Sequence, residues 1–286
     1  MNMILIADSG STKTDWSLVD ELSVRLQFST QGLNPFHQTE EQIVSVLDYA
    51  VNQTRSLCSK DDELSVYFYG AGCTPDKCVI IEGCFRSVCD ENTDIHVYSD
   101  MLGAARSLCG HSAGIACILG TGSNSCLYDG RDITANVSPL GYILGDEGSA
   151  AYIGKRLVAD VLKCQLPPSV CNMFFAEVNL TAADIINKVY RESLPNRFLG
   201  QLSQFCQRHL DVPEISKFIT DCFREFFRRN VLNYGHPEMS VHFIGSIAWV
   251  YSRQLCDAAV SMGLKVGNIC RTPMQGLIDY HLNSAD

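Results

Sequence analysis

The first side chains in this sequence whose types and spacing suggest chemistry lie between Asp8 and Lys13, where an acid precedes small and hydroxyl-bearing residues. Gly10 tolerates almost any backbone angle, and nearby hydroxyls add donors to the backbone N–H groups, so the turn could wrap around a phosphate oxygen. The residues expected to do so are Ser9, Gly10, Ser11, Thr12 and Lys13. The carboxylate of Asp8 could hold a hydrated Mg²⁺, because hard divalent cations prefer oxygen ligands and keep their water. An ordinary hairpin turn with an exposed lysine is the alternative interpretation.

A Walker A phosphate loop is excluded at this turn, although residues 10–14 contain some of its residue types. That motif requires Gly-Lys-Ser/Thr leading into a helix. Here no glycine directly precedes Lys13, and the residues that follow alternate between apolar and polar side chains, as a strand does. The turn is therefore predicted to join two strands, at 4–7 and 14–19, in a hairpin.

Asp100 is the second candidate for chemistry, because it follows a short stretch, 94–98, that is typical of a strand. In open α/β sheets the ligand crevice lies beyond the carboxyl ends of the strands, which is where this order places Asp100. A carboxylate at that position could take a proton from a substrate hydroxyl. It could also simply cap the helix that begins there, since Asp is a favoured N-cap residue.

Two further glycine-rich stretches follow. Residues 120–124 read Gly-Thr-Gly-Ser-Asn between apolar runs at 114–119 and 125–128, which repeats the plan of strand, small-residue loop and strand seen at the start of the chain. This repetition suggests duplicated lobes that hold a nucleotide's phosphates from either side. Asp146 and Glu147 then lie between glycines, ahead of a helix predicted at 150–162. Capping explains one acid, while the flanking glycines suggest close approach by a ligand.

Strands that alternate with amphipathic helices are expected to position these residues, which implies a partly parallel sheet. The first 110 residues are predicted to form further strands at 22–29 and 64–70 and helices at 40–58 and 77–89. Between them lies a loop with Asn34 before a proline. Its amide could serve as a fixed hydrogen-bonding group for a polyol or could merely form a turn.

The second lobe, 111–286, is predicted to contain a helical insertion at about 166–237. This region has no chemical motif, and its helical patches at 182–190, 198–206 and 215–232 are separated by prolines. Phe223, Phe226 and Phe227 are interpreted as core or dimer contacts. The last helix of the chain is expected to pack back on the first lobe, 1–110.

Composition limits the possible classes of protein. The chain has 286 residues, a net charge of -10 and a pI near 5.1, and its Lys and Arg are scattered, which argues against a nucleic-acid surface. No leader or membrane-spanning stretch is recognised, so a cytoplasmic protein is expected. The fourteen cysteines are dispersed, and those in apolar runs, such as Cys117, Cys126 and Cys222, should behave as small hydrophobes.

Together these stretches resemble the N-acetylglucosamine kinase and BadF/BadG/BcrA/BcrD ATPase-type family of the actin, Hsp70 and sugar kinase superfamily. The similarity is carried by residues 8–16, 99–100, 119–124 and 140–149, and by 241–248, which is similar to the adenosine motif. The resemblance implies an α/β fold of two duplicated ribonuclease H-like lobes, the actin-like ATPase fold, with a nucleotide cleft between the lobes and a helical cap in the second.

The resemblance also implies roles for individual residues. Asp100 would be the general base on a sugar hydroxyl, and Asp8 would lie near the metal. The groups around the phosphates would include Thr12, Lys13, Gly120, Thr121, Gly122 and Ser123. The hexosamine would be bound by Asn34, Asp100, Thr121, Gly141 and Asp146. The adenosine would be bound by Gly245 and Ser246.

The sequence therefore predicts a homodimeric kinase that uses ATP and Mg²⁺ to phosphorylate N-acetylglucosamine or glucosamine at the 6-OH. One alternative is a BadF-type ATPase that activates a radical enzyme, but such proteins need cluster-binding cysteines, and none lies in the loops where the resemblance would place them. Another is a non-catalytic sugar sensor, which would be expected to lose Asp8 or Asp100.

Overall fold

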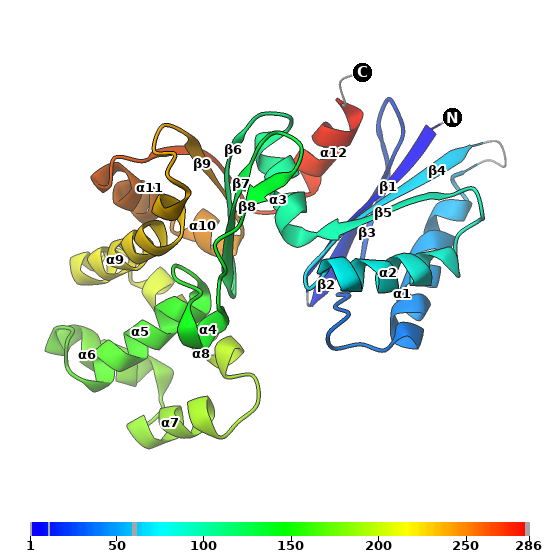
Figure 1. Ribbon diagram of the computed structural model, residues 1–286. Coiled ribbons are helices and arrows are strands. Elements are labelled where there is room, and N and C mark those ends of the chain that lie inside the picture. The colour runs from blue at the N-terminus through cyan, green and yellow to red at the C-terminus, as the bar shows by residue number, and fades with distance from the viewer. Residues whose placement is uncertain (1, 11, 59–61, 284–286) are drawn as a thin grey trace. The chain divides into compact units, whose positions relative to one another are not determined.

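Figure 1 shows the computed structural model of the chain, which describes residues 2–10, 12–58 and 62–283. The chain divides into two compact units. Unit 1 consists of residues 1–112, 130–132 and 273–286, and unit 2 of residues 113–129 and 133–272. Each unit is built on one five-stranded mixed sheet.

The sheet of unit 1 has the order β3-β2-β1-β4-β5. Its strands are β1 (Asn2–Ser9), β2 (Lys13–Val19), β3 (Val24–Gln31), β4 (Glu63–Gly70) and β5 (Asp94–Ser99). β1, β2 and β3 are antiparallel neighbours, while β4 runs parallel to β1, and β5 runs parallel to β4. The carboxyl ends of β1, β4 and β5 therefore meet at one edge of the sheet.

Helices cover both faces of this sheet. They are α1 (Glu40–Arg55), α2 (Pro75–Arg86), α3 (Asp100–Cys109) and α12 (Met274–Leu282). Because side chains alternate along a strand, Leu5 and Ala7 of β1 pack in the cluster that contains the buried residues of α1 and α2, whereas Ile6 packs with Leu277 of α12. Burial on both faces explains why β1 reads as a nearly continuous apolar run.

The last helix of the chain, α12, belongs to unit 1. Its Gly276 packs so closely on α3 that a Cβ atom would overlap the backbone of Ser107. The Ser107 hydroxyl in turn donates to the carbonyl of Pro273, 2.9 Å away. Residues almost at the end of the sequence thus support the helix that begins at Asp100.

Unit 2 repeats this topology. Its strands are β6 (Gly114–Leu119), β7 (Ser123–Tyr128), β8 (Ile133–Ala135), β9 (Ser240–Ile244) and β10 (Lys265–Cys270), in the order β8-β7-β6-β9-β10. As in unit 1, the first strand pairs antiparallel with the second and parallel with the fourth. The predicted duplication of an α/β lobe is confirmed by this equivalence.

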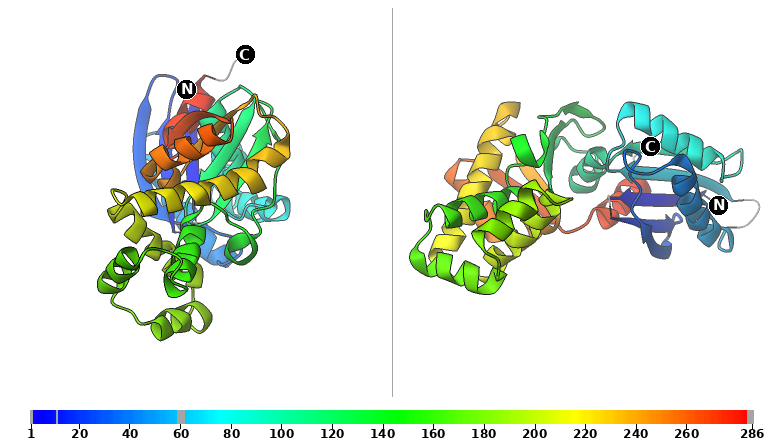
Figure 2. Two further views of the ribbon diagram at one scale, coloured as in Figure 1. Left: turned by 90° about the vertical axis from the view of Figure 1, so that its left-hand side faces the viewer. Right: turned by 90° about the horizontal axis from the view of Figure 1, so that it is seen from below.

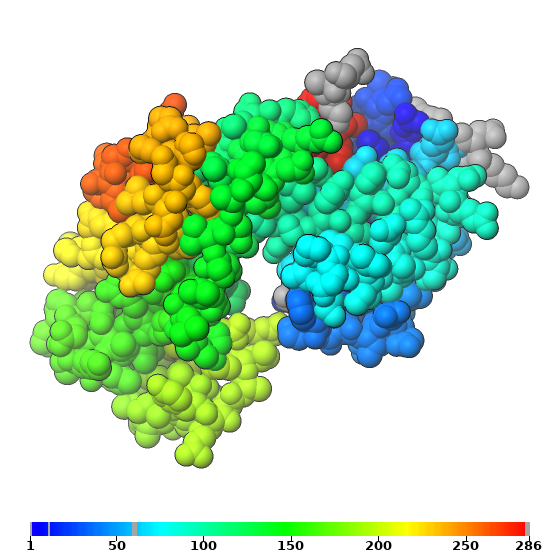
Figure 3. Space-filling model, in the orientation of Figure 1, coloured from blue at the N-terminus to red at the C-terminus, as the bar shows by residue number. Residues whose placement is uncertain are grey.

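Most of the helices of unit 2 lie between β8 and β9. They are α4 (Gly141–Leu144), α5 (Ala150–Leu162), α6 (Pro168–Val178), α7 (Ala182–Tyr190), α8 (Pro195–Arg208), α9 (Pro213–Arg229) and the 3-10 helix η1 (Val231–Tyr234), with α10 (Ser246–Val250) and α11 (Ser252–Ser261) following β9. In the space-filling view the helices between β8 and β9 form the green to yellow part of the surface (Figure 3). Figure 2 shows α9 and α11 side by side.

The three phenylalanines near the end of α9 that were singled out in the sequence lie in the core of unit 2. Phe223, Phe226 and Phe227 are fully buried, and the ring of Phe227 meets that of Phe243 in β9 edge-on, with centroids 5.8 Å apart. These contacts hold α9 against the sheet. They confirm the first of the two roles expected for these phenylalanines, as core residues. The three cysteines expected in apolar surroundings, Cys117, Cys126 and Cys222, are also buried.

Several predicted boundaries were wrong by two or three residues. The third strand begins at Val24 rather than 22, because the Asp20 carboxylate accepts from the N–H groups of Leu22 and Ser23 and forms a turn. The helix predicted at 77–89 begins at Pro75 and ends at Arg86, since proline is well suited to the first turn of a helix. The prolines interpreted as breaks, Pro195 and Pro213, likewise start α8 and α9.

Other elements were not predicted. Residues 141–144 form α4, for which no helix was predicted. α6 lies within the helical insertion predicted at about 166–237 but was not one of its predicted helical patches, and α10, α11 and β10 were not predicted. All fourteen cysteines are free thiols. Among the residues that the structure describes, no group of three or more His, Cys, Asp or Glu side chains is arranged to hold a metal, and no helix is both long and apolar enough to cross a membrane.

Candidate functional site

The two candidate carboxylates of unit 1 lie at the same edge of its sheet. Asp8 is near the carboxyl end of β1, where it lies opposite Tyr69 of β4 in the register. Asp100 follows β5, whose last residue, Ser99, lies opposite Gly70 of β4. The parallel strands thus bring together two acids that are more than ninety residues apart in the sequence.

The electrostatics of Asp8 and Asp100 are unusual for carboxylates. The pKa of Asp8 is raised to about 7, mainly by burial and further by the charges of Asp15 and Asp100, while Lys13 opposes the shift. Burial also raises the pKa of Asp100 to about 6, although N–H groups at the start of α3 favour its charged form. Repulsion of this kind would be relieved by a nearby cation.

Asp100 is not the cap of its helix. The N-cap is Ser99, whose hydroxyl accepts a hydrogen bond from the N–H of Leu102 at 3.2 Å. Asp100 is the first helical residue, so the capping role that the sequence left open belongs to its neighbour. A carboxylate with a pKa of about 6 can accept a proton near neutral pH, as a general base must.

The turn after β1 is tight. The N–H of Gly10 donates to the carbonyl of Lys13 at 2.9 Å, and the Lys13 ammonium pairs with Asp15 at 2.7 Å. Gly10 and Thr12 are exposed, as a phosphate-binding turn requires, while Ser11 lies outside the described residues. Ser9 differs from them, because it is fully buried.

The Ser9 hydroxyl is used inside the fold. It lies 2.7 Å from the Thr14 hydroxyl, and it both donates to the carbonyl of Leu33 and accepts from its N–H. Asn34, the next residue, accepts from the N–H of Phe36 through its side-chain oxygen at 3.0 Å. Asn34 therefore forms a turn, the second of the two roles considered for it, and a contact with sugar stays a prediction.

In unit 2 the glycine-rich loop between β6 and β7 is fixed to the start of α5. The carbonyls of Gly120 and Thr121 accept from the N–H groups of Ala150 and Ala151, at 2.9 and 3.1 Å. Thr121 is exposed. These two hydrogen bonds to the start of α5 fix the conformation of the loop.

Asp146 meets this loop although it lies 23 residues away. Its carboxylate accepts from the N–H of Ser123 at 3.2 Å, and a Cβ atom on Gly122 would lie 3.1 Å from it. Burial raises the pKa of Asp146, and the Ser123 N–H opposes that shift. The predicted phosphate loop and the predicted sugar-binding acid are therefore neighbours, and glycine at 122 leaves the space for their contact.

Gly245, from the predicted adenosine motif, also reaches this edge of the sheet. It has a φ of 116°, which favours glycine, and a Cβ atom there would overlap the carbonyl of Leu119 at the end of β6. Ser246 follows as the exposed first residue of α10. Unit 2 thus gathers its predicted residues around the carboxyl ends of β6 and β9.

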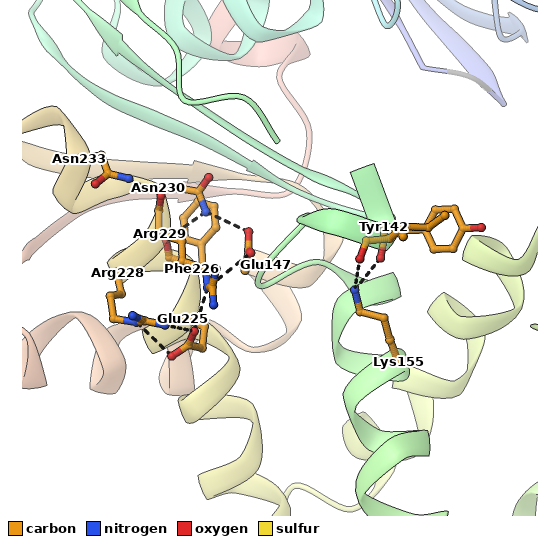
Figure 4. A network of polar contacts seen from close by, with 10 residues as sticks. Tyr142, Glu147, Lys155, Glu225, Phe226, Arg228, Arg229, Asn230 and Asn233 are labelled. Carbon is orange, nitrogen blue, oxygen red and sulfur yellow. Dashed lines mark hydrogen bonds and ion pairs between the residues drawn. The ribbon is translucent and has the colours of Figure 1, made fainter. Parts of the chain in front are cut away.

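The side chains that support residues 139–149 were not predicted from the sequence. Figure 4 shows several of them. α5 is capped by Ser149 and not by Glu147. The Glu147 carboxylate is instead buried, 3.5 Å from the side-chain nitrogen of Asn230 in one direction and 3.7 Å from Nε of Arg229 in another. Lys155 of α5 donates to backbone carbonyls of α4. The one local sequence signal for this support was Lys155 itself, a charged residue among the apolar residues of α5.

Comparisons with known proteins add to this geometry. No protein-family model matches the sequence. A Porphyromonas gingivalis protein provisionally described as an N-acetylglucosamine kinase is 49% identical, and the match covers 98% of this chain and 99% of that one, with a TM-score of 0.89. A Chromobacterium violaceum protein described in the same way is 16% identical, covers 97% and 98% of the two chains, and gives a TM-score of 0.75, which supports the fold.

A curated relative is similar to a shorter part of this chain. The N-acetyl-D-glucosamine kinase of Dictyostelium discoideum is 24% identical over 201 residues, which are 64% of this chain. The chain spans only 63% of the length of that relative. The duplicated sheets and the 49% identity over nearly the full length confirm the predicted fold and family. This chain belongs to the N-acetylglucosamine kinase-type family of sugar kinase-like proteins.

Proposed function

We propose that this protein is an ATP-dependent kinase of an amino sugar, N-acetylglucosamine or glucosamine, with the 6-OH as the acceptor. The observation that carries the proposal is Asp100, a carboxylate at a strand end whose pKa is raised to about 6, in a chain of this family. A base with a pKa near the working pH can take the hydroxyl proton as the oxygen attacks the γ-phosphoryl group.

Unit 1 would supply the charged groups. Asp8 is suited to a hydrated Mg²⁺, since one carboxylate, waters and phosphate oxygens satisfy that ion. Its raised pKa reflects burial first and the negative charges of Asp15 and Asp100 second. When bound, Mg²⁺ would neutralise charge that builds on the transferred phosphoryl group. The remaining N–H groups of the turn and the Lys13 ammonium would bind phosphate oxygens, whereas the Gly10 N–H already donates to the Lys13 carbonyl.

Unit 2 would bind phosphate, the adenosine and the sugar. Thr121 and Gly122 would offer backbone N–H groups to phosphate, and Gly120, whose N–H donates to the Gly122 carbonyl at 2.9 Å, would hold the loop in shape. Gly245 and Ser246 would lie against the adenosine. The Asp146 carboxylate has acceptor positions beyond its bond to Ser123, so it can accept from sugar hydroxyls, and Gly141 would let the sugar approach the backbone. Asn34 of unit 1 would complete the sugar contacts. A homodimeric, cytoplasmic protein without nucleic-acid or membrane partners is part of the same proposal and rests on the family and the composition.

A coupled assay of ADP release tests this function across glucosamine, N-acetylglucosamine, glucose and buffer alone. We expect rapid release with one of the amino sugars, slower release with glucose and little with buffer. Sugar-independent hydrolysis would favour the ATPase-activator alternative. Absence of ADP release with every sugar would contradict the kinase.

A further inference from the structure

Residues 139–147, here called the sugar loop, form a segment in which Tyr142 packs against the core of unit 2, whereas Leu140, Ile143 and Leu144 are exposed. The N–H of Asp146 donates to the carbonyl of Pro139 at 2.9 Å, which closes the loop at its base, and α4 forms its tip. None of the four residues of α4 is buried, and Ile143 and Leu144 are 68% and 73% exposed. Because so short a helix is unstable by itself, its shape must be maintained by groups from outside.

The backbone of the sugar loop is also strained. Leu140 and Asp146, which flank α4, have φ angles of 59° and 54°, in the left-handed region that side-chain-bearing residues seldom occupy. Strain of this kind persists only where surrounding structure fixes the conformation. Asp146 is one of the two residues on this loop assigned to the sugar, so the strain lies at the proposed site.

Lys155 supplies support from outside the loop. From α5, its ammonium donates to the carbonyl of Tyr142 at 2.6 Å and to that of Ile143 at 3.3 Å (Figure 4). These carbonyls lie in the last turn of α4, where an α-helix has unsatisfied acceptors and the negative end of its dipole. Partial burial lowers the pKa of Lys155, and the charges of Glu147 and Asp146 oppose this. The ammonium therefore satisfies acceptors that α4 cannot satisfy within itself.

The other side-chain anchor of this segment acts at its base. Glu147 is held near Asn230 and Arg229 (Figure 4). Gly148 lies close to Phe226, since a Cβ atom on it would be 3.0 Å from the Cβ atom of Phe226. These contacts fix the chain where it enters α5, one residue beyond Asp146, but they do not reach α4. Lys155 and Glu147 thus hold two different parts of the same segment.

A cavity beside Lys155 gives α4 room to move. It has a volume of about 420 Å³ and is lined by Tyr142, Ile143 and Lys155 together with apolar side chains of α5, α7 and α8. Close packing that would by itself resist a shift of α4 is missing on this side. Loss of the Lys155 hydrogen bonds should therefore change the position of α4 rather than unfold the unit.

We propose that Lys155 is a positioning residue for sugar binding, which holds α4, and with it Gly141 and Asp146, in the geometry that receives the sugar. The inference rests on the proposed function, because it assigns Gly141 and Asp146 to the sugar. Lys155 itself would touch neither substrate. Its effect should appear in the KM for sugar and in the mobility of residues 139–147.

Lys155→Met tests this, because methionine keeps an unbranched apolar stem and removes the ammonium. We expect the KM for N-acetylglucosamine to rise about tenfold, the scale of one lost charge-assisted hydrogen bond, while kcat and the KM for ATP change less than about threefold. Amide hydrogen exchange in residues 139–147, measured without substrates, should become faster. Lys155→Arg, which keeps donors and charge, should restore much of the KM and the protection.

Lys163→Met is the matched control, since Lys163 is exposed at the C-terminal end of the same helix. It should leave KM and exchange unchanged. Unchanged exchange in Lys155→Met would overturn the anchoring role, and faster exchange with an unchanged KM would overturn the positioning role while the proposed function stands. A wild-type protein that phosphorylates no amino sugar would overturn the proposed function and the positioning role together.

Discussion

The two units have the same strand order but place different chemistry at equivalent edges of their sheets. In unit 1 the parallel strands end near Asp8 and Asp100, two carboxylates with raised pKa values. In unit 2 the corresponding strands are followed by Gly120 and Gly245, which carry no side-chain charge and whose backbone groups are hydrogen-bonded within the unit. One topology can therefore serve a metal and a proton in one copy and phosphate and adenosine in the other.

The units differ as well in what lies between the third and fourth strands. Unit 1 has the single helix α1 there, whereas unit 2 has α4 to α9 and η1. The sugar loop is the first part of this insertion, so it has no counterpart in unit 1. An insertion at the end of a conserved sheet edge adds a binding element without changing the sheet that supports it.

The largest expected effect is a loss of kcat when the candidate base of unit 1, Asp100, is replaced. Asp100→Asn should lower kcat by about 100-fold or more, the usual scale for a lost general base, without changing the affinity for ATP. Steady-state kinetics and calorimetry measure both quantities. Asp94→Asn is the control, because Asp94 is an exposed acid at the start of β5, the strand that Asp100 follows. Its kcat should be near that of the wild type. Wild-type turnover in Asp100→Asn would remove Asp100 from the mechanism.

The next effect concerns unit 2. Asp146→Ala should raise the KM for the sugar by about 10- to 100-fold, because polar groups built to bind sugar hydroxyls are left unpaired when one contact is lost. The KM for ATP should change much less. Asp257→Ala, an exposed acid on α11, controls for the loss of one negative charge from the unit. A normal sugar KM in Asp146→Ala would show that the sugar binds elsewhere.

A smaller effect is expected at the metal. Asp8→Ala should weaken the binding of Mg·ATP about tenfold or more, as one lost charge-assisted contact does, and should leave the binding of free sugar nearly unchanged. Isothermal calorimetry with each ligand separately gives the two affinities. Equal losses for both ligands would mean that Asp8 supports the fold of unit 1 instead.

The smallest effect tests the carboxylate electrostatics through stability. The folded-state pKa of Asp8, about 7, lies above its ordinary value of 3.8, so the folded protein retains a proton that the unfolded chain releases. Stability should therefore fall as the pH rises from about 4 to about 7. Asp8→Asn, which cannot ionise, should raise the Tm at pH 8 in the absence of Mg²⁺ and have little effect at pH 4. Equal Tm values at pH 8 would contradict the raised pKa.

Local sequence signals predicted the elements whose ends are marked by residues nearby in the sequence, such as glycine-rich turns. β6 was placed at its observed bounds because a continuous apolar run ends at a Gly-Thr-Gly turn. α5 was also placed at its observed bounds, after a glycine-punctuated loop, although its cap, Ser149, was not predicted. The duplication could also be read from the repeated order of strand, small-residue loop and strand. Each of these signals lies within about ten residues, where propensity and periodicity act.

Contacts between distant residues could not be read in this way. The choice of Ser99 over Asp100 as the helix cap depends on side-chain geometry that both residue types permit. The use of the Ser9 hydroxyl by Thr14 and Leu33 follows from the pairing of β1 and β2 and from the loop that follows β3. A residue type offers several hydrogen bonds, and tertiary packing selects among them.

The sequence by itself thus determined that the chain is a duplicated α/β protein and predicted which short loops would bind anionic ligands, since both depend on local pattern and on glycine. Tertiary structure decided which acids face one another, that Asp146 meets Ser123, and that Lys155 supports α4. Burial raises the pKa of both Asp8 and Asp100, and neighbouring charges raise that of Asp8 further. Both effects arise only when strands distant in the sequence are brought to one edge of a sheet.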